Sequence, residues 1–263
     1  MSRQQAQGMS IFQFNRVIDM SFVYSRNYII ILFVVLVVII ALPRVQKILD
    51  ENNFQEGVTA ASEGNYVAAL EAWEPLARDK DKRAEFNIGL MYMKGEGVKQ
   101  DYVLAADWFR RSANQNNPKA QYNLSVLYHE GNGVSKDIAF AIKWLLRSAN
   151  QGFALAQFNL GAIYLKGEEV DADYVKALKW TQLAASQGLP LAMNNIGHMY
   201  LNGVGVEKNM ATGRMWMLLA VEQGSAQSKS GLSEVDEVIS ASDKSRSEKL
   251  ARICAGKKFK DCS

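Results

Sequence analysis

The amino-acid sequence predicts an all-α protein, in which an α/α solenoid of helical hairpins follows one N-terminal transmembrane helix. Two observations lead to this prediction. A block of 36 residues recurs four times without insertion, starting at Ala84, Ala120, Ala156 and Ala192, and a long apolar run lies near the N-terminus. A fixed period of this length is typical of stacked units that bury their apolar faces against one another.

Composition fits a folded chain and argues against one class of function. Of the 263 residues, 48% are hydrophobic and 22% are charged, which is the balance of a globular protein and not of a disordered one. The formal net charge of +3 is too small to indicate nucleic-acid binding, which needs a concentrated basic face. The chain has four prolines, and helix-forming residues dominate from about position 54 onward.

The apolar run predicts a membrane anchor. No charged residue occurs from Asn27 to Pro43, and residues 28–42 read YIIILFVVLVVIIAL. A helix needs about 17–25 such residues to span a bilayer, and a buried strand is the alternative. A cleaved signal peptide is disfavoured because Ala41 is the only small residue where the run ends. We therefore expect a short cytoplasmic N-terminus over 1–27 and an uncleaved transmembrane anchor over 28–43.

Two weak signals orient this anchor. Three arginines precede the run, whereas Arg44 and Lys47 follow it, and this slight bias favours an N-terminus in the cytoplasm. Cys254 and Cys262 lie together near the C-terminus. They are candidates for a disulfide in an oxidising compartment, or for two reduced thiols in the cytosol. No second Cys or His pair lies nearby, so a zinc site is not expected.

Each block predicts two helices. Ala, Leu or Ile, Gly and Tyr recur at spacings of four, one and three, which places them on one face of a first helix. A glycine then provides the left-handed C-cap, and Asp or Asn provides the N-cap of a second helix. Tryptophans in that second helix are expected to pack it onto the first: Trp108, Trp144, Trp180 and Trp216.

These positions resemble the Sel1-like branch of the tetratricopeptide repeat superfamily, whose pattern is AxxxLGxxYxxGxGVxxDxxKAxxWxxxAAxxG. The likeness covers roughly Ala84 to Gly224. Three positions depart from the pattern: Glu169 replaces the second loop glycine, Ser125 replaces a packing glycine, and Gly213 replaces a helix alanine. We expect these departures to weaken individual hairpins and to leave the architecture intact.

The resemblance also gives the domain boundaries and a binding surface. The repeat solenoid is expected over 54–224, beginning with a half-repeat over 54–83, and a C-terminal helical cap over 225–263. First helices line the concave face of a tetratricopeptide superhelix. The residues expected to face inward are Phe86, Leu90, Met93, Tyr122, Val126, His129, Phe158, Ala162, Leu165, Asn194, His198 and Leu201.

This expected face is mostly apolar and aromatic, with two histidines, and it suits a peptide or a partner helix. The candidate ligand contacts on it are Phe86, Tyr122, Phe158, Asn194, His129 and His198, together with the asparagine column Asn87, Asn123, Asn159 and Asn195. A side-chain amide donates to and accepts from a peptide backbone at once, so the column fits an extended ligand. The alternative is that each asparagine bonds the adjacent hairpin and fixes the stacking angle.

No catalytic grouping is predicted. His129 and His198 are the two histidines of the chain, they belong to different repeats, and neither matches a metal-ligand motif. The loops GEGV, GNGV and GVGV lack the GxGxxG spacing and a following Lys-Ser/Thr, so they do not indicate phosphate binding. We therefore expect no enzyme activity, no cofactor and no metal.

The predicted function is that of a non-enzymatic adaptor in a bacterial inner membrane. Its repeat array would lie in the periplasm and bind a peptide or partner protein along the concave face. One alternative is a membrane-tethered scaffold that faces the cytoplasm. Another is a module for cell-wall glycan, in which Phe86, Tyr122 and Phe158 would act as stacking platforms.

Overall fold

The computed structural model describes residues 39–260 and 262 of the chain. In this part the chain forms helices joined by short turns and loops, with no strand. A helix over 39–62 comes first. The helices that follow are α2 (Tyr66–Arg78), α3 (Lys82–Lys94), α4 (Tyr102–Asn114), α5 (Pro118–Glu130), α6 (Ile138–Asn150), α7 (Ala154–Lys166), α8 (Tyr174–Ala185), α9 (Pro190–Asn202), α10 (Met210–Glu222), α11 (Ala226–Val238) and α12 (Ala241–Gly256).

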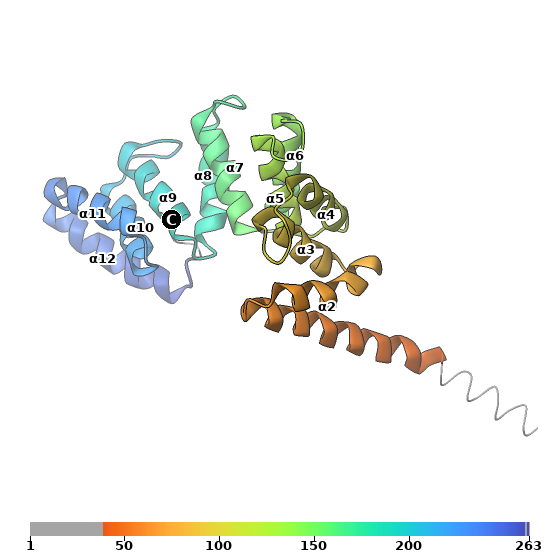
Figure 1. Ribbon diagram of the computed structural model, residues 1–263. Coiled ribbons are helices and arrows are strands. Elements are labelled where there is room, and N and C mark those ends of the chain that lie inside the picture. Colours follow the sequence, from red (N-terminus) through yellow and green to blue (C-terminus); the bar gives the residue numbers. More distant parts are fainter. Residues whose placement is uncertain (1–38, 261, 263) are drawn as a thin grey trace, which may run out of the picture.

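The helices pair as hairpins that stack in chain order, as Figure 1 shows. The four predicted repeats are the hairpins α3–α4, α5–α6, α7–α8 and α9–α10, which we number one to four. Each first helix begins two residues before the predicted start of its block, at Lys82, Pro118, Ala154 and Pro190. The predicted all-α solenoid is therefore confirmed.

Local capping chemistry defines the ends of the helices, as the sequence predicted. Gly95 closes α3 with φ 76° and ψ 27°, a left-handed conformation that costs a glycine little. Asp101 opens α4, and its carboxylate accepts hydrogen bonds from the backbone amides of Val103 and Leu104. The same two caps recur in each hairpin: a left-handed glycine ends the first helix, and an Asp or Asn opens the second.

The segment predicted as a half-repeat, 54–83, contains the end of the helix over 39–62 and all of α2, and these two helices form a hairpin. The indole N–H of Trp73 in α2 donates to the carbonyl oxygen of Phe54, 3.2 Å away, in the helix over 39–62. A side chain added at Gly57 would lie 2.3 Å from that indole, just as one added at Gly89 would lie 2.8 Å from Phe109. The array therefore begins earlier than position 54, with a hairpin whose turn is shorter than the later loops.

The predicted anchor over 28–43 lies outside the described residues, except for positions 39–43, and so does the predicted N-terminal segment over 1–27. Positions 39–43 are helical, and Ile39, Ile40 and Leu42 are exposed by 60%, 51% and 61%. Within the part of the chain that the structure describes, no helix has both the length and the apolar character needed to cross a bilayer.

The tryptophans, predicted to pack each second helix onto the first, lie among core residues of their own first helix and of the preceding hairpin. Trp144 and Trp216 are buried, and Trp108 and Trp180 are half-buried among core residues. In hairpins one, three and four the residue after the tryptophan faces the glycine of the first helix. At Gly197, for example, an added Cβ would lie 2.6 Å from Met217, so the small residue allows the two helices to approach closely.

A ladder of buried polar side chains connects the hairpins. In hairpins one to three, a glutamine after the second helix donates to a buried acceptor in the first helix, at 2.7 Å each: Gln115 to Glu85, Gln151 to Gln121, and Gln187 to Gln157. Gln121 and Gln157 also donate to the carbonyl oxygens of Ala113 and Ala149 in the preceding hairpin, at 3.1 Å. The ladder therefore satisfies buried polar groups both within and between hairpins.

The predicted C-terminal cap is a helical hairpin, α11–α12, and both of its helices pack on α10. Arg214 of α10 is 3% exposed. Its guanidinium bonds the carboxylate of Asp236 in α11 at 2.6 Å and the hydroxyl of Ser247 in α12 at 2.7 Å. The matching position of hairpin three is the aliphatic Leu178, so this arginine is specific to the junction with the cap.

Glu85 provides a test of the buried ladder. Burial raises the pKa of Glu85, and its matching residues Gln121 and Gln157 are neutral. We expect Glu85→Gln to stabilise the full chain at pH 7 by about 1 kcal/mol, or roughly 2–4 °C in Tm. The difference in stability between the variant and the wild type should shrink as the pH falls through the raised pKa of Glu85. The reason is that the folded wild type binds the Glu85 proton more tightly than the unfolded chain does. Circular dichroism melts across pH measure this; an equal gain from Glu71→Gln at an exposed site would contradict it.

Arg214 provides a test of the cap. The guanidinium lowers the pKa of Asp236, so the pair contributes stability at neutral pH that is lost as the pH falls through that lowered pKa. We expect Asp236→Ala to cost about 2–4 kcal/mol, because it leaves the buried guanidinium with only the exposed carboxylate of Glu248, 3.8 Å away, as an ion partner. The double variant Arg214→Leu/Asp236→Ala should cost less than the single one. Thermal melts and limited proteolysis of α11–α12 would refute this if the double variant were the worse of the two.

Candidate functional site

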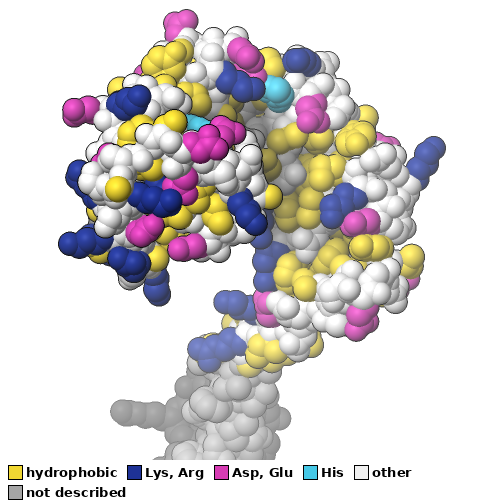
Figure 2. All heavy atoms as spheres, turned by 90° about the vertical axis from the view of Figure 1, so that its left-hand side faces the viewer, with side chains coloured by type: hydrophobic (Ala, Val, Ile, Leu, Met, Phe, Trp, Pro, Cys, Tyr) yellow, Lys and Arg dark blue, Asp and Glu magenta, His cyan; other side chains and the backbone are white. Residues whose placement is uncertain are grey.

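A pocket of about 440 Å³ opens between hairpins two and three. In Figure 2 this side of the molecule is hollowed, hydrophobic side chains gather in the hollow, and charged side chains of both signs stand around it. The pocket is lined by Tyr122, Ser125, Val126, His129, Glu130, Ala141, Ile142, Leu145, Asn159, Ala162, Ile163, Lys166, Glu168 and Glu169. Most of these residues belong to the first helices α5 and α7.

The pocket has an apolar floor and a charged rim. Ile142 and Leu145 of α6 and Ile163 of α7 provide aliphatic surface, and Leu145 is 4% exposed. Charged groups stand where α5 and α7 end, and they include Glu130 and Lys166. Such a mixture of apolar surface with a few convergent polar groups is typical of a binding site.

Tyr122 and Asn159 join the two sides of the pocket. The ring of Tyr122 packs edge-on against Phe153, with 5.4 Å between the ring centroids. The amide of Asn159 donates to the Tyr122 hydroxyl at 3.3 Å, across the boundary between hairpins two and three. At this boundary the asparagine therefore bonds the neighbouring hairpin, and it is also one of the residues that line the pocket.

His129 and Glu169 form a contact across the mouth of the pocket. The imidazole Nε2 of His129 in α5 lies 2.6 Å from a carboxylate oxygen of Glu169 in the loop after α7. Their side chains are 47% and 23% exposed, so both remain open to solvent on one side. The contact spans the same boundary as the bond from Asn159 to Tyr122.

The asparagine column does not behave uniformly. The amide of Asn123 donates to the carbonyl oxygen of Lys119 in its own helix, at 2.9 Å. The described residues offer no hydrogen bond to the half-buried side chains of Asn87 and Asn195. Only Asn159 bonds an adjacent hairpin, so the alternative role, a bond from each asparagine to the adjacent hairpin, does not hold for the whole column.

The other expected contact residues lie outside the pocket. Phe86 and Phe158 are half-buried, and each packs against a core cluster that includes residues of the next hairpin. The Phe86 ring centroid is also 5.8 Å from that of Phe109, in the second helix of its own hairpin. Asn194 is 2% exposed and accepts a hydrogen bond from Ser228 of α11 at 2.8 Å, so its side chain is not open to a ligand. His198 is exposed on α9.

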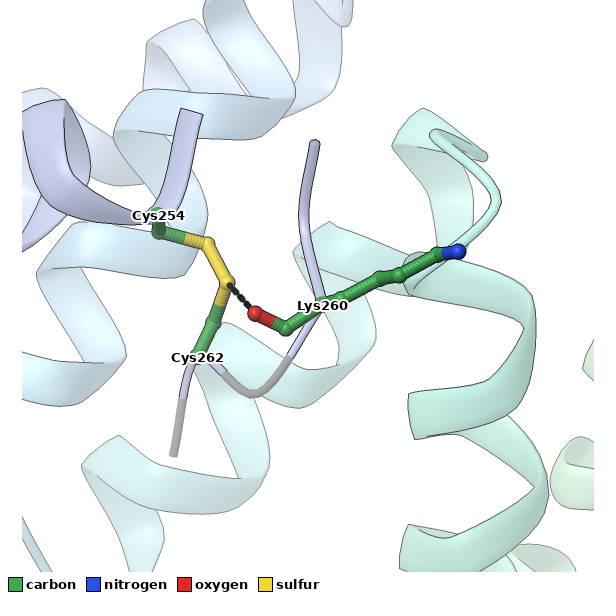
Figure 3. The surroundings of a disulfide bond; sticks show 3 residues. All are labelled: Cys254, Lys260 and Cys262. Carbon is green, nitrogen blue, oxygen red and sulfur yellow. Dashed lines mark hydrogen bonds between the residues drawn. A yellow bond between two sulfur atoms is a disulfide. The ribbon is translucent and has the colours of Figure 1, made fainter. Parts of the chain in front are cut away.

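The predicted cysteine pair is joined in the structure. A disulfide links Cys254, buried in α12, to Cys262, beyond the end of that helix. Figure 3 shows the chain turning back toward α12 through Lys260, whose carbonyl oxygen lies 3.5 Å from the Cys262 sulfur. Phe259, next to this turn, packs against the core of hairpin four. The bond therefore holds the C-terminal segment on the array.

The position of the pocket follows from one loop. In three loops a glycine with positive φ lies directly against the first residue of an earlier second helix. An added Cβ at these glycines would come within 2.5 Å of Tyr66, 2.2 Å of Tyr102 and 2.4 Å of Tyr174, for Gly97, Gly133 and Gly205. A residue with a Cβ atom could not approach the helix this closely, so these positions require glycine.

The boundary between hairpins two and three departs from this pattern on both sides. Glu169 stands where the other loops have glycine, and Ile138 stands where α2, α4 and α8, the helices that those glycines approach, begin with tyrosine. Glu169 does not have a positive φ. Because its side chain does not fit the close approach, the loop lies differently, and the pocket opens at this boundary.

The arrangement suits binding more than chemistry. Within the part of the chain that the structure describes, no three His, Cys, Asp or Glu side chains gather as a metal site would require. The histidine in the pocket pairs with a carboxylate but has no serine, threonine or cysteine nucleophile in hydrogen-bond contact with it. The pocket presents apolar surface and charge to another molecule.

Known proteins share this architecture. The segments 82–117, 118–153, 154–189 and 190–225 each match the Sel1 repeat. A Sel1 repeat protein from Oxalobacter formigenes is 33% identical with a TM-score of 0.66, covering 69% of this chain and 74% of that one. A protective antigen of uropathogenic Escherichia coli strains, with an SLR fold, is 36% identical with a TM-score of 0.65. This chain is covered to 70% and spans 40% of that antigen. No curated protein matches.

Gly133 provides a test of the loop rule. We expect Gly133→Ala to lower the stability of the full chain by roughly 2 kcal/mol more than Gly152→Ala, because only the first adds a steric clash. Both glycines have positive φ, 70° and 86°, so both variants carry the same backbone strain. No atom lies within 4 Å of a Cβ at Gly152. Thermal melts compare the two, and equal losses would show that the loop does not need the close approach.

Proposed function

The chain belongs to the Sel1 repeat family, and from this membership we propose that it is a non-enzymatic adaptor anchored in a bacterial inner membrane. Proteins with Sel1 repeats generally mediate protein–protein interactions, and the scaffold is generally non-catalytic. In this proposal the array lies in the periplasm, and a peptide or partner protein binds along the concave face. The similar structures named above come from bacteria, which supports the proposed source.

The pocket between hairpins two and three is the observation that carries the binding function. It brings together three residues that the sequence assigned to the concave face, Tyr122, His129 and Asn159. Val126 and Ala162, also expected there, line the same pocket and are half-buried. A groove with this lining suits a segment of peptide or a partner helix.

The N-terminal run supports the membrane anchor. Its charge-free length of 17 residues, from Asn27 to Pro43, lies at the lower edge of what a spanning helix needs, about 17–25 residues. Its last apolar residues, including Leu42, are exposed in the structure, and a bilayer would cover them. The helix over 39–62 is unbroken, and its C-terminal part pairs with α2 as a hairpin.

Two observations favour the periplasm over the cytoplasm. Three arginines precede the apolar run, which favours a cytoplasmic N-terminus and therefore an exported array. The disulfide between Cys254 and Cys262 would persist in an oxidising compartment, whereas the cytosol keeps thiols reduced. A cytoplasmic scaffold is the alternative. Glycan binding is less well supported, because Phe86, Tyr122 and Phe158 are half-buried against neighbouring side chains.

Photo-crosslinking in living cells tests this function. A photo-reactive amino acid would replace Val126 or Ala162 in the pocket, or, as a control, Lys143, which is exposed on α6. We expect one envelope protein to be captured from both pocket positions and not from position 143, because only the pocket faces the partner. Mass spectrometry identifies the adduct. Capture of cytosolic proteins would contradict the periplasmic topology, and equal capture from position 143 would contradict binding in the groove.

A further inference from the structure

We propose that the pocket between hairpins two and three determines which partner binds, and that it takes an arginine side chain of the partner peptide. This inference rests on the proposed function, because it names the chemistry of a ligand for the same concave face. The stem of the arginine would lie along the apolar floor, and its guanidinium would meet the carboxylates at the rim.

The repeats themselves show that this pocket is chemically singular. At the position of His129 the other hairpins carry Met93, Leu165 and Leu201. At the position of Glu130 they carry Lys94, Lys166 and Asn202. At the position of Glu169 they carry Gly97, Gly133 and Gly205. Three departures from the repeat therefore meet in one pocket. The repeat architecture does not require them, which favours a role in binding.

The charge of the rim selects a cation. Glu130, Glu168 and Glu169 place three carboxylates around the pocket, against the single ammonium of Lys166. The rim is therefore negative whether the imidazole of His129 is neutral or protonated. Glu130 and Glu168 are exposed, and no described cation lies within ion-pair distance of either carboxylate. Glu130 accepts a hydrogen bond from the neutral amide of Asn132 at 2.6 Å, so both carboxylates lack a cationic partner that a ligand could supply.

The floor selects a long apolar stem in addition to the charge. Ile142, Leu145 and Ile163 form aliphatic surface beneath the rim. Arginine buries its methylene stem along such surface while its planar guanidinium bonds carboxylates in pairs. An acidic side chain would be repelled by the rim, and a purely apolar one would leave the carboxylates without a partner.

A peptide selection on the purified full chain in detergent micelles tests the inference. Random dodecapeptides displayed on phage are selected on the wild type, and the dominant sequence is synthesised with fluorescein, beside a twin in which citrulline replaces arginine. Citrulline keeps the shape of the side chain and removes its charge. Fluorescence anisotropy then measures Kd for both peptides. We expect arginine next to an aliphatic residue in the selected sequences, and at least tenfold weaker binding of the twin.

The matched variants separate the rim from charge in general. Glu130→Gln/Glu168→Gln removes two exposed carboxylates and should weaken the arginine peptide at least tenfold, with little effect on the twin. Glu96→Gln is the control, because Glu96 occupies the position of Glu168 in hairpin one, away from the pocket. It should leave both Kd values unchanged.

Selected peptides without arginine, or equal binding to wild type and double variant, would overturn the inference and leave peptide binding on the concave face intact. If the wild type selects no peptide, the crosslinking from Val126 and Ala162 distinguishes the two proposals. A partner captured there without any peptide binding would overturn this inference alone. No selection and no capture would overturn both.

Discussion

The close approach of each loop to the preceding hairpin is the constraint on which this array depends. Gly97, Gly133 and Gly205 allow the loop backbone to lie against the start of an earlier second helix, where any side chain would clash. At these three boundaries the loop lies against the preceding hairpin. At the fourth, Glu169 prevents the same approach, and the binding pocket opens there. One rule of packing therefore accounts for the close approach at three loops and for its loss beside this pocket.

Buried polar contacts give the stack its order and its ends. The glutamine ladder satisfies side chains such as Gln121 within a hairpin and to the one before it, so each hairpin is positioned by its neighbour. At the C-terminal end the ladder gives way to Arg214, whose partners come from α11 and α12. A solenoid needs such a terminal unit, because its last repeat would otherwise expose an apolar face.

Much of the fold follows from the sequence because it is local. The period, the glycine and aspartate caps and the tryptophan column depend on residues close together in the chain. The hairpin formed by the helix over 39–62 and α2 was only half recognised, because its shorter turn shifts Gly57 out of the 36-residue register. The burial of Asn194 depends on Ser228, which lies beyond the repeats. Glu169 was recognised as a departure, but its effect requires knowing which helix its loop would touch.

The unbroken helix over 39–62 carries a mechanical consequence. It continues the apolar run and also forms the N-terminal hairpin of the array together with α2, to which Trp73 holds it. Under the proposed topology no flexible tether separates the bilayer from the groove. A helix turns about 100° per residue, so the helical phase sets the direction in which the pocket faces. Inserting or deleting one residue near position 47 would therefore rotate the whole array by about 100° around the axis of this helix.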